Sequence, residues 1–131
     1  MRGKQLFYLV AAATLVLDQI AKFLADNAGL AIHNKGSAFG LVVPAIIPIL
    51  LSLAAILVIV YYRKQILKNK TLCVLSAIIL GGVLGNLIDR LFLGFVRDFI
   101  NFRIWPAFNL ADAGLTIGVV GLIVYLAMKK R

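Results

Sequence analysis

Two aspartates in the last third of the sequence have the residue type and the setting for acid–base chemistry. Asp98 lies within the mostly apolar run 95–100, and Asp112 lies near the start of the last long apolar stretch. The connector between them is short, so we expect their carboxylates to approach one boundary of the hydrophobic region. Two carboxylates at close range cannot both ionise and would share a proton. One could then activate water while the other polarises a carbonyl, as in aspartic proteases.

A simpler role for Asp112 is electrostatic, because an acid stabilises the N-terminus of a helix. We expect the last helix to begin at about residue 107, with Pro106 suited to its first turn. Asp112 would then lie five residues into the helix, roughly 8 Å past its start. That depth favours the shared-proton interpretation over the electrostatic one.

The third apolar stretch ends in a polar cluster. Gly81 and Gly85 form a G-x-x-x-G pattern, which predicts close packing of helices. Asn86, Asp89 and Arg90 follow, and the first two of these share one helical face. The cluster is compatible with an amphipathic helix end and also with part of a functional site.

Asp18 and Lys22 interrupt the first apolar stretch. Asp18 would lie roughly 18 Å from its start, and Lys22, four residues on, shares its face. A carboxylate in a membrane segment can act as a proton or ion carrier. A carboxylate paired with a lysine one turn away is instead held ionised, with the lysine extending toward the outer surface. We therefore expect a structural ion pair that holds the first helix to the outer loops.

The composition predicts that these residues belong to a membrane protein. Of the 131 residues, 63% are hydrophobic and 15% are charged, whereas a soluble domain carries roughly a quarter charged residues. Four stretches have the roughly 20 apolar residues that span a bilayer, at about 6–24, 45–62, 72–93 and 107–128. A cleaved signal peptide is disfavoured for the first stretch, since no cleavage site follows it. We expect a single all-α membrane domain, residues 1–131, with four transmembrane helices.

The distribution of charge predicts an orientation. A formal net charge of +9 would suit a nucleic-acid binder only if it formed a basic face on a soluble domain. Instead, nine bases and no acid lie in the N-terminus, the second connecting segment and the C-terminus. The positive-inside rule places these segments and both termini in the cytoplasm, against anionic membrane lipids. The aspartates then lie toward the outer leaflet, and we expect no nucleic-acid partner.

Neither metal nor cofactor chemistry is indicated. The sequence has no cluster with metal-ligand spacing and no glycine-rich phosphate loop after a strand. Cys73 and His33 are expected on opposite sides of the membrane, so they cannot form the nucleophile–base pair that a reactive thiol requires. We predict that the protein uses no metal and no cofactor.

Five motifs together resemble the lipoprotein signal peptidases (signal peptidase II), aspartyl endopeptidases of the bacterial inner membrane with four transmembrane helices. Each motif is weak alone, but their order and spacing over nearly the whole chain are highly specific. They are Leu17–Lys22 (D-Q-x-x-K), His33–Gly40 (N-x-G-x-A-F), Gly85–Arg90 (G-N-x-x-D-R), Gly94–Ile100 (G-x-V-x-D-F) and Trp105–Asp112 (W-P-x-F-N-x-A-D).

The resemblance implies that Asp98 and Asp112 are the catalytic pair. It implies a prolipoprotein substrate whose lipobox cysteine already carries diacylglycerol and which is cleaved just before that cysteine. It also implies inhibition by globomycin-type peptides, and it implies no metal or cofactor. The substrate-binding or supporting positions that it implies are Asn34, Gly36, Asn86, Asp89, Arg90 and Asn109.

The sequence departs from the family pattern in two places. The segment 25–44, which in the family forms a small β-cradle over the site, is short, so we expect a short extracytoplasmic cradle or loop. Arg97 stands where many members have an apolar residue.

The alternative class is a small four-helix drug or proton transporter with a membrane-embedded acid at the place of Asp18. Such a transporter should have short loops on both sides and one essential acid. Here the outer segments are long and carry the polar motifs, and Asp18 has a lysine partner. The sequence therefore favours the peptidase.

Overall fold

The protein is a mostly helical bundle in the computed structural model, which describes residues 2–38 and 41–130. In this part of the chain, three helices are long and apolar enough to cross a membrane: α1 (Gly3–Asn27), α4 (Lys70–Leu93) and α5 (Leu110–Lys129). A further apolar helix, α2 (Ile46–Tyr61), has 16 residues. The short helix α3 (Arg63–Lys68) connects α2 to α4. The spans predicted at 6–24, 45–62 and 72–93 agree with α1, α2 and α4 to within three residues at each end.

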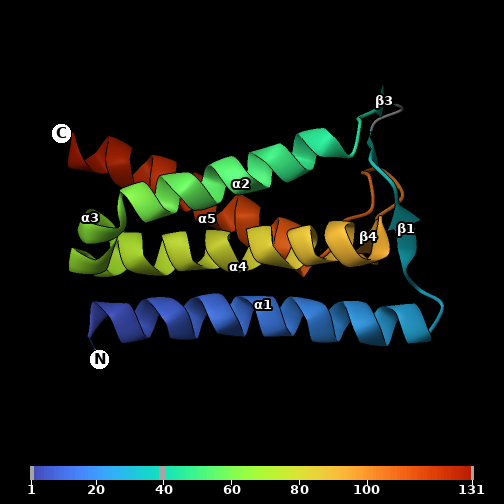
Figure 1. Ribbon diagram of the computed structural model, residues 1–131, viewed down its shortest axis with the longest axis horizontal. Coiled ribbons are helices and arrows are strands. Elements are labelled where there is room, and N and C mark those ends of the chain that lie inside the picture. Colours follow the sequence, from blue (N-terminus) through green and yellow to red (C-terminus); the bar gives the residue numbers. More distant parts are fainter. Residues whose placement is uncertain (1, 39–40, 131) are drawn as a thin grey trace.

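Helix α4 is the centre of the bundle. In Figure 1, α1 lies along one side of α4, α2 lies along the other, and α5 passes behind. The glycines of α4 allow this close packing, because a Cβ at Gly81 would collide with Thr14 of α1. A Cβ at Gly82 would collide with the backbone of Ala111 in α5. The packing that the G-x-x-x-G pattern predicts is confirmed.

Helix α5 begins later than predicted, so the expected start at residue 107, with Pro106 in the first turn, is wrong. Asn109 is the N-cap, and its side-chain oxygen accepts a hydrogen bond from the backbone N–H of Asp112. The Asp112 carboxylate accepts one from the backbone N–H of Asn109 in return, which completes a capping box. Phe108, directly before the cap, forms an antiparallel bridge with Ile100 and is therefore not part of the helix.

Short strands lie at the end of the bundle opposite the two chain termini (Figure 1). Strand β1 (Ile32–Asn34) pairs antiparallel with β4 (Val96–Asp98), with Ile32 opposite Asp98. Strand β2 (Ser37–Ala38) pairs with β3 (Leu41–Val42) in a second small sheet. The short segment between α1 and α2 therefore forms strands, and one of them fixes the strand that ends in Asp98.

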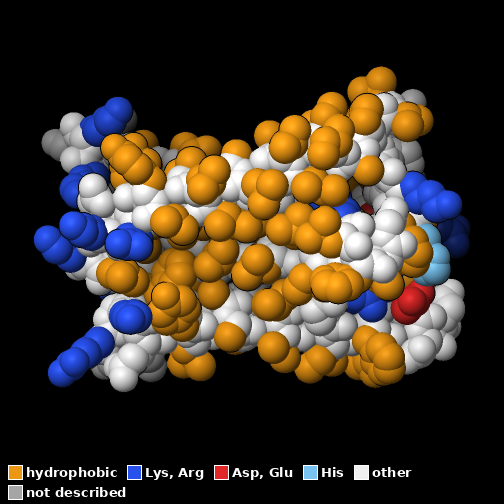
Figure 2. Space-filling view, viewed as in Figure 1, with side chains coloured by type: hydrophobic (Ala, Val, Ile, Leu, Met, Phe, Trp, Pro, Cys, Tyr) orange, Lys and Arg blue, Asp and Glu red, His pale blue; other side chains and the backbone are white. Residues whose placement is uncertain are grey.

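The kinds of side chain on the surface change along the length of the bundle. Figure 2 shows a broad apolar band around the middle, with Lys and Arg gathered at the end that carries the termini. The opposite end carries Asp and His as well as basic side chains. This pattern suits a protein with its middle in hydrocarbon and its two ends in the polar layers.

The contact between Gly82 and α5 generates a stability prediction. Gly82→Leu should lower the free energy of unfolding by about 1–3 kcal/mol, because the added side chain overpacks a closed helix interface. Thermal unfolding in detergent measures the change. Ala13→Leu is the control, since Ala13 is exposed on α1, and its midpoint should stay close to that of the wild type. Equal destabilisation by the two variants would contradict the packing interpretation.

Candidate active site

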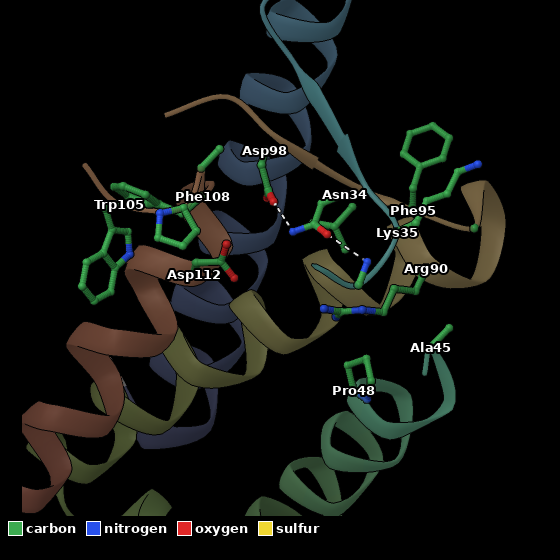
Figure 3. Close-up of a pocket in the computed structure, with 15 residues that line it drawn as sticks. Asn34, Lys35, Ala45, Pro48, Arg90, Phe95, Asp98, Trp105, Phe108 and Asp112 are labelled. Atoms are coloured by element: carbon green, nitrogen blue, oxygen red, sulfur yellow. Dashed lines mark hydrogen bonds between the residues drawn. The ribbon is translucent and has the colours of Figure 1, made fainter. Parts of the chain in front are cut away.

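A pocket of about 350 Å³ opens at the strand-bearing end of the bundle. One wall of the pocket carries the polar side chains. The other wall is apolar and is formed by the start of α2 and the segment that precedes α5. Figure 3 shows the side chains of Asp98 and Asp112 entering the pocket from separate elements. The other lining residues include Asn34, Gly36, Ala45, Pro48, Arg90, Trp105 and Phe108.

Asp98 is the last residue of β4 and is 3% exposed. Its two carboxylate oxygens each accept a hydrogen bond from an asparagine amide. Asn34 Nδ2 donates to Oδ2 at 3.0 Å, and Asn109 Nδ2 donates to Oδ1 at 2.8 Å. The Asn34 contact depends on β1, which pairs with β4 and so brings an amide from residue 34 to a carboxylate from residue 98.

Asp112 lies in the first turn of α5, so the prediction that it lies roughly 8 Å past the helix start is wrong. Its Oδ2 accepts the backbone N–H of Asn109 at 3.2 Å, which is the helix-capping role. Its Oδ1 also accepts a hydrogen bond from Asn86 Nδ2 of α4 at 2.8 Å. Asp112 therefore caps its own helix, as the electrostatic alternative proposed, and it also faces the pocket beside Asp98.

Asn86 and Asn109 form a neutral layer directly behind the two aspartates. Asn86 Oδ1 accepts from Lys22 Nζ at 3.0 Å and from Asn109 Nδ2 at 3.1 Å. A lysine can only donate, so the oxygen of Asn86 must face Lys22 and its NH₂ group must face Asp112. The backbone N–H of Asp112 fixes the orientation of Asn109 in the same way, which turns the Asn109 NH₂ group toward Asp98. Both carboxylates therefore meet donors on the side away from the pocket.

Behind this layer lies a buried ion cluster. Lys22 and Asp18 are both 0% exposed and pair at 2.7 Å, as their spacing predicts. The expectation that Lys22 extends to the outer surface is wrong, because its ammonium group also lies 3.5 Å from Asp89 within the bundle. Asp18 Oδ1 accepts the backbone N–H of Ala111 at 2.8 Å. The pair thus joins α1, α4 and α5 at one level.

Arg97 is the second cation of this cluster. Its Nη2 lies 2.8 Å from Asp89 Oδ1 and 2.9 Å from Gln19 Oε1. Its backbone N–H and its Nε both donate to Asp89 Oδ2, at 3.0 and 3.2 Å. These bonds to Asp89 hold the pKa of Arg97 above its ordinary value. Arg97 directly precedes Asp98, so the same clamp that holds β4 to α4 also holds the residue beside it.

The sequence did not reveal this role of Arg97. The one available signal is that Asp18 and Asp89 face Lys22 together, which leaves two acids with one lysine. A second buried cation is needed for balance, and the arginine in the mostly apolar run 95–100 is a candidate for it.

The pKa of the Asp98 carboxyl is raised from its ordinary value of 3.8 to about 6, mainly by burial. The nearby Asp112 charge contributes to this rise, while the hydrogen bonds from Asn34 and Asn109 and the charge of Lys22 act in the opposite direction. A carboxyl group with this pKa holds its proton at a pH where an exposed aspartate has lost it. This is the environment in which one acid of a pair can donate a proton near neutral pH.

The predicted supporting residues divide into three groups. Asn34, Gly36 and Arg90 line the pocket. Gly36 has a positive φ of 112° and donates its backbone N–H to Asn34 Oδ1 at 2.8 Å, so a glycine is needed for this turn. Asn86 and Asn109 bond the aspartates directly. Asp89 does neither and contributes only through the ion cluster. The motif residues Phe39 and Gly40 lie outside the described residues.

The two remaining candidate residues, His33 and Cys73, do not lie together. His33 is exposed and lies 2.7 Å from Asp26, whereas Cys73 is buried and donates to the carbonyl of Gly3 near the other end of the bundle. In residues 2–38 and 41–130, no group of three or more His, Cys, Asp or Glu could hold a metal ion.

Apolar helices of spanning length, with one buried and one half-buried carboxylate at a pocket, define a membrane protein with the geometry of an acid–base site. The comparisons with known proteins agree with this class. The sequence profile described as Signal peptidase (SPase) II matches residues 10–128. The chain belongs to this family of bacterial membrane peptidases.

Relatives match over nearly their full length. The lipoprotein signal peptidase of Halothermothrix orenii is 36% identical over 95% of this chain and 97% of its own. That of Sulfurihydrogenibium sp. is 42% identical over 100% of this chain and 98% of its own. A bacterial membrane enzyme solved by the in meso method at 2.3 Å superposes with a TM-score of 0.84 at 28% identity, covering 95% of this chain and 88% of that one.

The Arg97 clamp predicts a large loss of stability on substitution. Arg97→Gln should lower the free energy of unfolding by about 3–5 kcal/mol, because it leaves the buried Asp89 with an incomplete set of partners. Chemical or thermal unfolding in detergent measures this. Arg103→Gln is the matched control, since Arg103 is exposed, and it should change stability by about 0.5 kcal/mol or less. Equal losses of stability in Arg97→Gln and Arg103→Gln would show that Arg97 is only a surface residue.

The raised pKa of Asp98 predicts a pH-dependent effect of Asp98→Asn. The folded carboxyl titrates at about 6 and the ordinary one at 3.8, so between these values the folded state holds more protons than the unfolded state. Wild-type stability therefore falls through this window as pH rises, whereas an amide has no such penalty. The thermal unfolding midpoint of Asp98→Asn minus that of the wild type should grow as the pH is raised from about 4 to about 8. A difference that is constant with pH would contradict the burial of Asp98.

Proposed function

We propose that this membrane peptidase is an aspartic endopeptidase with Asp98 and Asp112 as its catalytic pair. The observation that carries the proposal is that both carboxylates reach one pocket, each held from behind by an asparagine side chain. The amides stabilise the pair without neutralising it, since in residues 2–38 and 41–130 the hydrogen bonds to the two carboxylates come from neutral amide groups. A pair in this state can share a single proton.

The mechanism follows from the two carboxylates. One of them, ionised, takes a proton from a water molecule in the pocket as that water attacks the peptide carbonyl carbon. The other, protonated, donates a hydrogen bond to the carbonyl oxygen as negative charge develops on it. Proton transfer to the departing amine then breaks the C–N bond and returns the pair to its starting state. The raised pKa of Asp98 supports Asp98 as the acid that holds the shared proton.

The proposed substrate is a prolipoprotein whose lipobox cysteine carries diacylglycerol, with cleavage just before that cysteine. The apolar wall of the pocket, with Pro48, Trp105 and Phe108, suits a substrate that enters from the membrane with its acyl chains. Arg90 lines the same pocket and supplies donors for backbone carbonyls of an extended peptide. A globomycin-type peptide would inhibit by occupying this space.

The proposed orientation places both termini in the cytoplasm and the pocket at the outer leaflet of the bacterial inner membrane. The described part of the basic end carries Lys and Arg but none of the five aspartates, which lie in the half of the bundle with the pocket. In this arrangement four helices, including the short α2, span the membrane. The strands between α1 and α2 form an extracytoplasmic cradle beside the site.

The Asp18–Lys22 pair has a structural role in this proposal. Lys22, Gln19 and the Ala111 backbone N–H all bond the Asp18 carboxylate, which is fully buried. A proton carrier needs access to water on one side at a time, and these contacts leave Asp18 none. No observation therefore favours the transporter alternative.

The pair predicts that Asp98→Asn and Asp112→Asn each reduce cleavage by about 10²-fold or more, since an amide can accept a hydrogen bond but cannot take a proton from water. The measurement is release of the signal peptide from a diacylglyceryl-modified prolipoprotein by the purified enzyme. The double variant should be little slower than either single one, because the two residues act as a unit.

The matched control is Asp26→Asn, which removes an exposed carboxylate outside the pocket and should leave the rate near that of the wild type. Binding of a globomycin-type peptide checks that each variant has kept its pocket. A folded Asp112→Asn protein that retains more than a few per cent of wild-type turnover would remove Asp112 from the mechanism. An unlipidated precursor cleaved at the same rate would contradict the proposed substrate.

A further inference from the structure

A second hollow lies between α1 and α2, at the end of the bundle that carries the termini. Its volume is about 220 Å³. Tyr8 of α1 and Val60 of α2 stand in its walls and are exposed, so it opens at the lateral surface. Leu80 of the central helix α4 lines it as well, and Ile66 of α3 closes it at the basic end. We call this hollow the α3 groove.

The α3 groove has one charged residue, Arg63. The rest of its lining is aliphatic or aromatic. Arg63 is exposed at the first position of α3, and no carboxylate within residues 2–38 and 41–130 forms an ion pair with it. All five aspartates lie in the other half of the bundle, so no acidic side chain of the described residues lies at this end. Arg63 is therefore available to pair with an anion from outside the protein.

The length of α2 fixes the depth of Arg63. Its 16 residues span about 24 Å, which is less than the roughly 30 Å of a bilayer core. A helix this short draws its flanking residues toward the hydrocarbon boundary. Arg63 lies two residues after the end of α2. In the proposed arrangement, in which α2 spans the membrane, its guanidinium lies at the level where phospholipids carry their phosphate and glycerol groups.

We infer that the α3 groove binds one anionic phospholipid from the leaflet at the basic end. An acyl chain lies between α1 and α2, and the phosphate pairs with Arg63. A guanidinium binds phosphate through two parallel hydrogen bonds and suits this role better than the compact, strongly hydrated ammonium of a lysine. Lys64, the next residue of α3, adds positive charge beside the headgroup. The site is distinct from the active-site pocket, and its test does not depend on proteolysis.

The test is native mass spectrometry of the purified full-length protein with phosphatidylglycerol or with phosphatidylcholine of the same acyl chains. The wild type should retain one phosphatidylglycerol under conditions that remove phosphatidylcholine. Arg63→Gln should weaken that retention by about fivefold. Lys130→Gln is the matched control, because it removes one charge from the same end of the bundle but outside the groove, and it should retain the lipid as the wild type does.

A third variant tests the acyl chain. Ile59→Trp fills the groove while keeping every charge, so it should lose the bound lipid, and its thermal unfolding reports whether it has folded. Three outcomes would overturn the inference: equal loss in Arg63→Gln and Lys130→Gln, equal retention of the two lipids, or retention by a folded Ile59→Trp. Equal loss in the two charge variants would indicate binding through diffuse surface charge. Equal retention of the two lipids would indicate that the groove binds a neutral lipid. The comparison of Arg63→Gln with Lys130→Gln decides the matter even if Ile59→Trp does not fold.

Discussion

The buried ammonium of Lys22 is the constraint around which the rest of the site is arranged. A cation with no exposure inside a membrane protein is tolerated only if acceptors surround it. Here the acceptors are Asp18 on its own helix and Asn86 and Asp89 on α4. Because the oxygen of Asn86 must face the lysine, its NH₂ group must face the pocket. The position of Lys22 in α1 thus decides that Asp112 in α5 accepts a hydrogen bond from the NH₂ group of Asn86.

The chain places four buried or half-buried acids in two different environments. Asp18 and Asp89 face the cations Lys22 and Arg97. Asp98 and Asp112 face amide groups. Cations hold a carboxylate ionised, whereas neutral donors leave its proton affinity under the control of burial and of the neighbouring acid. The layer of two asparagines separates these environments by one side chain. Burial, together with the neighbouring Asp112 charge, raises the pKa of Asp98.

The strands contribute more to the site than their length suggests. Strand β4 carries Asp98 at its end, Arg97 clamps the strand to α4, and Asn34 reaches Asp98 from the neighbouring strand β1. The backbone pairs only over three positions, so side-chain bonds supply much of what holds the strand. The side chain of Arg97 clamps β4 to α4 through Asp89, which an apolar residue at this position could not do.

The sequence predicted Asp98 and Asp112 together with Asn34, Asn86 and Asn109, and these side chains lie together at one end of the bundle. Long apolar stretches and the G-x-x-x-G pattern fix helices and a packing face, since these depend on spacing along one helix. The Asp18–Lys22 pair was predictable for the same reason. The tertiary structure alone decided the contacts between elements distant in sequence, such as Asn34 with Asp98, Arg97 with Asp89, and Lys22 with Asn86. It also decided the start of α5, because a bridge to Ile100 and the Asn109 cap outweigh the preference of Pro106 for a first helical turn. The spacing of residues along one helix determines which helical face a side chain occupies. Its hydrogen-bond or ion-pair partner on another element is determined only when the helices pack.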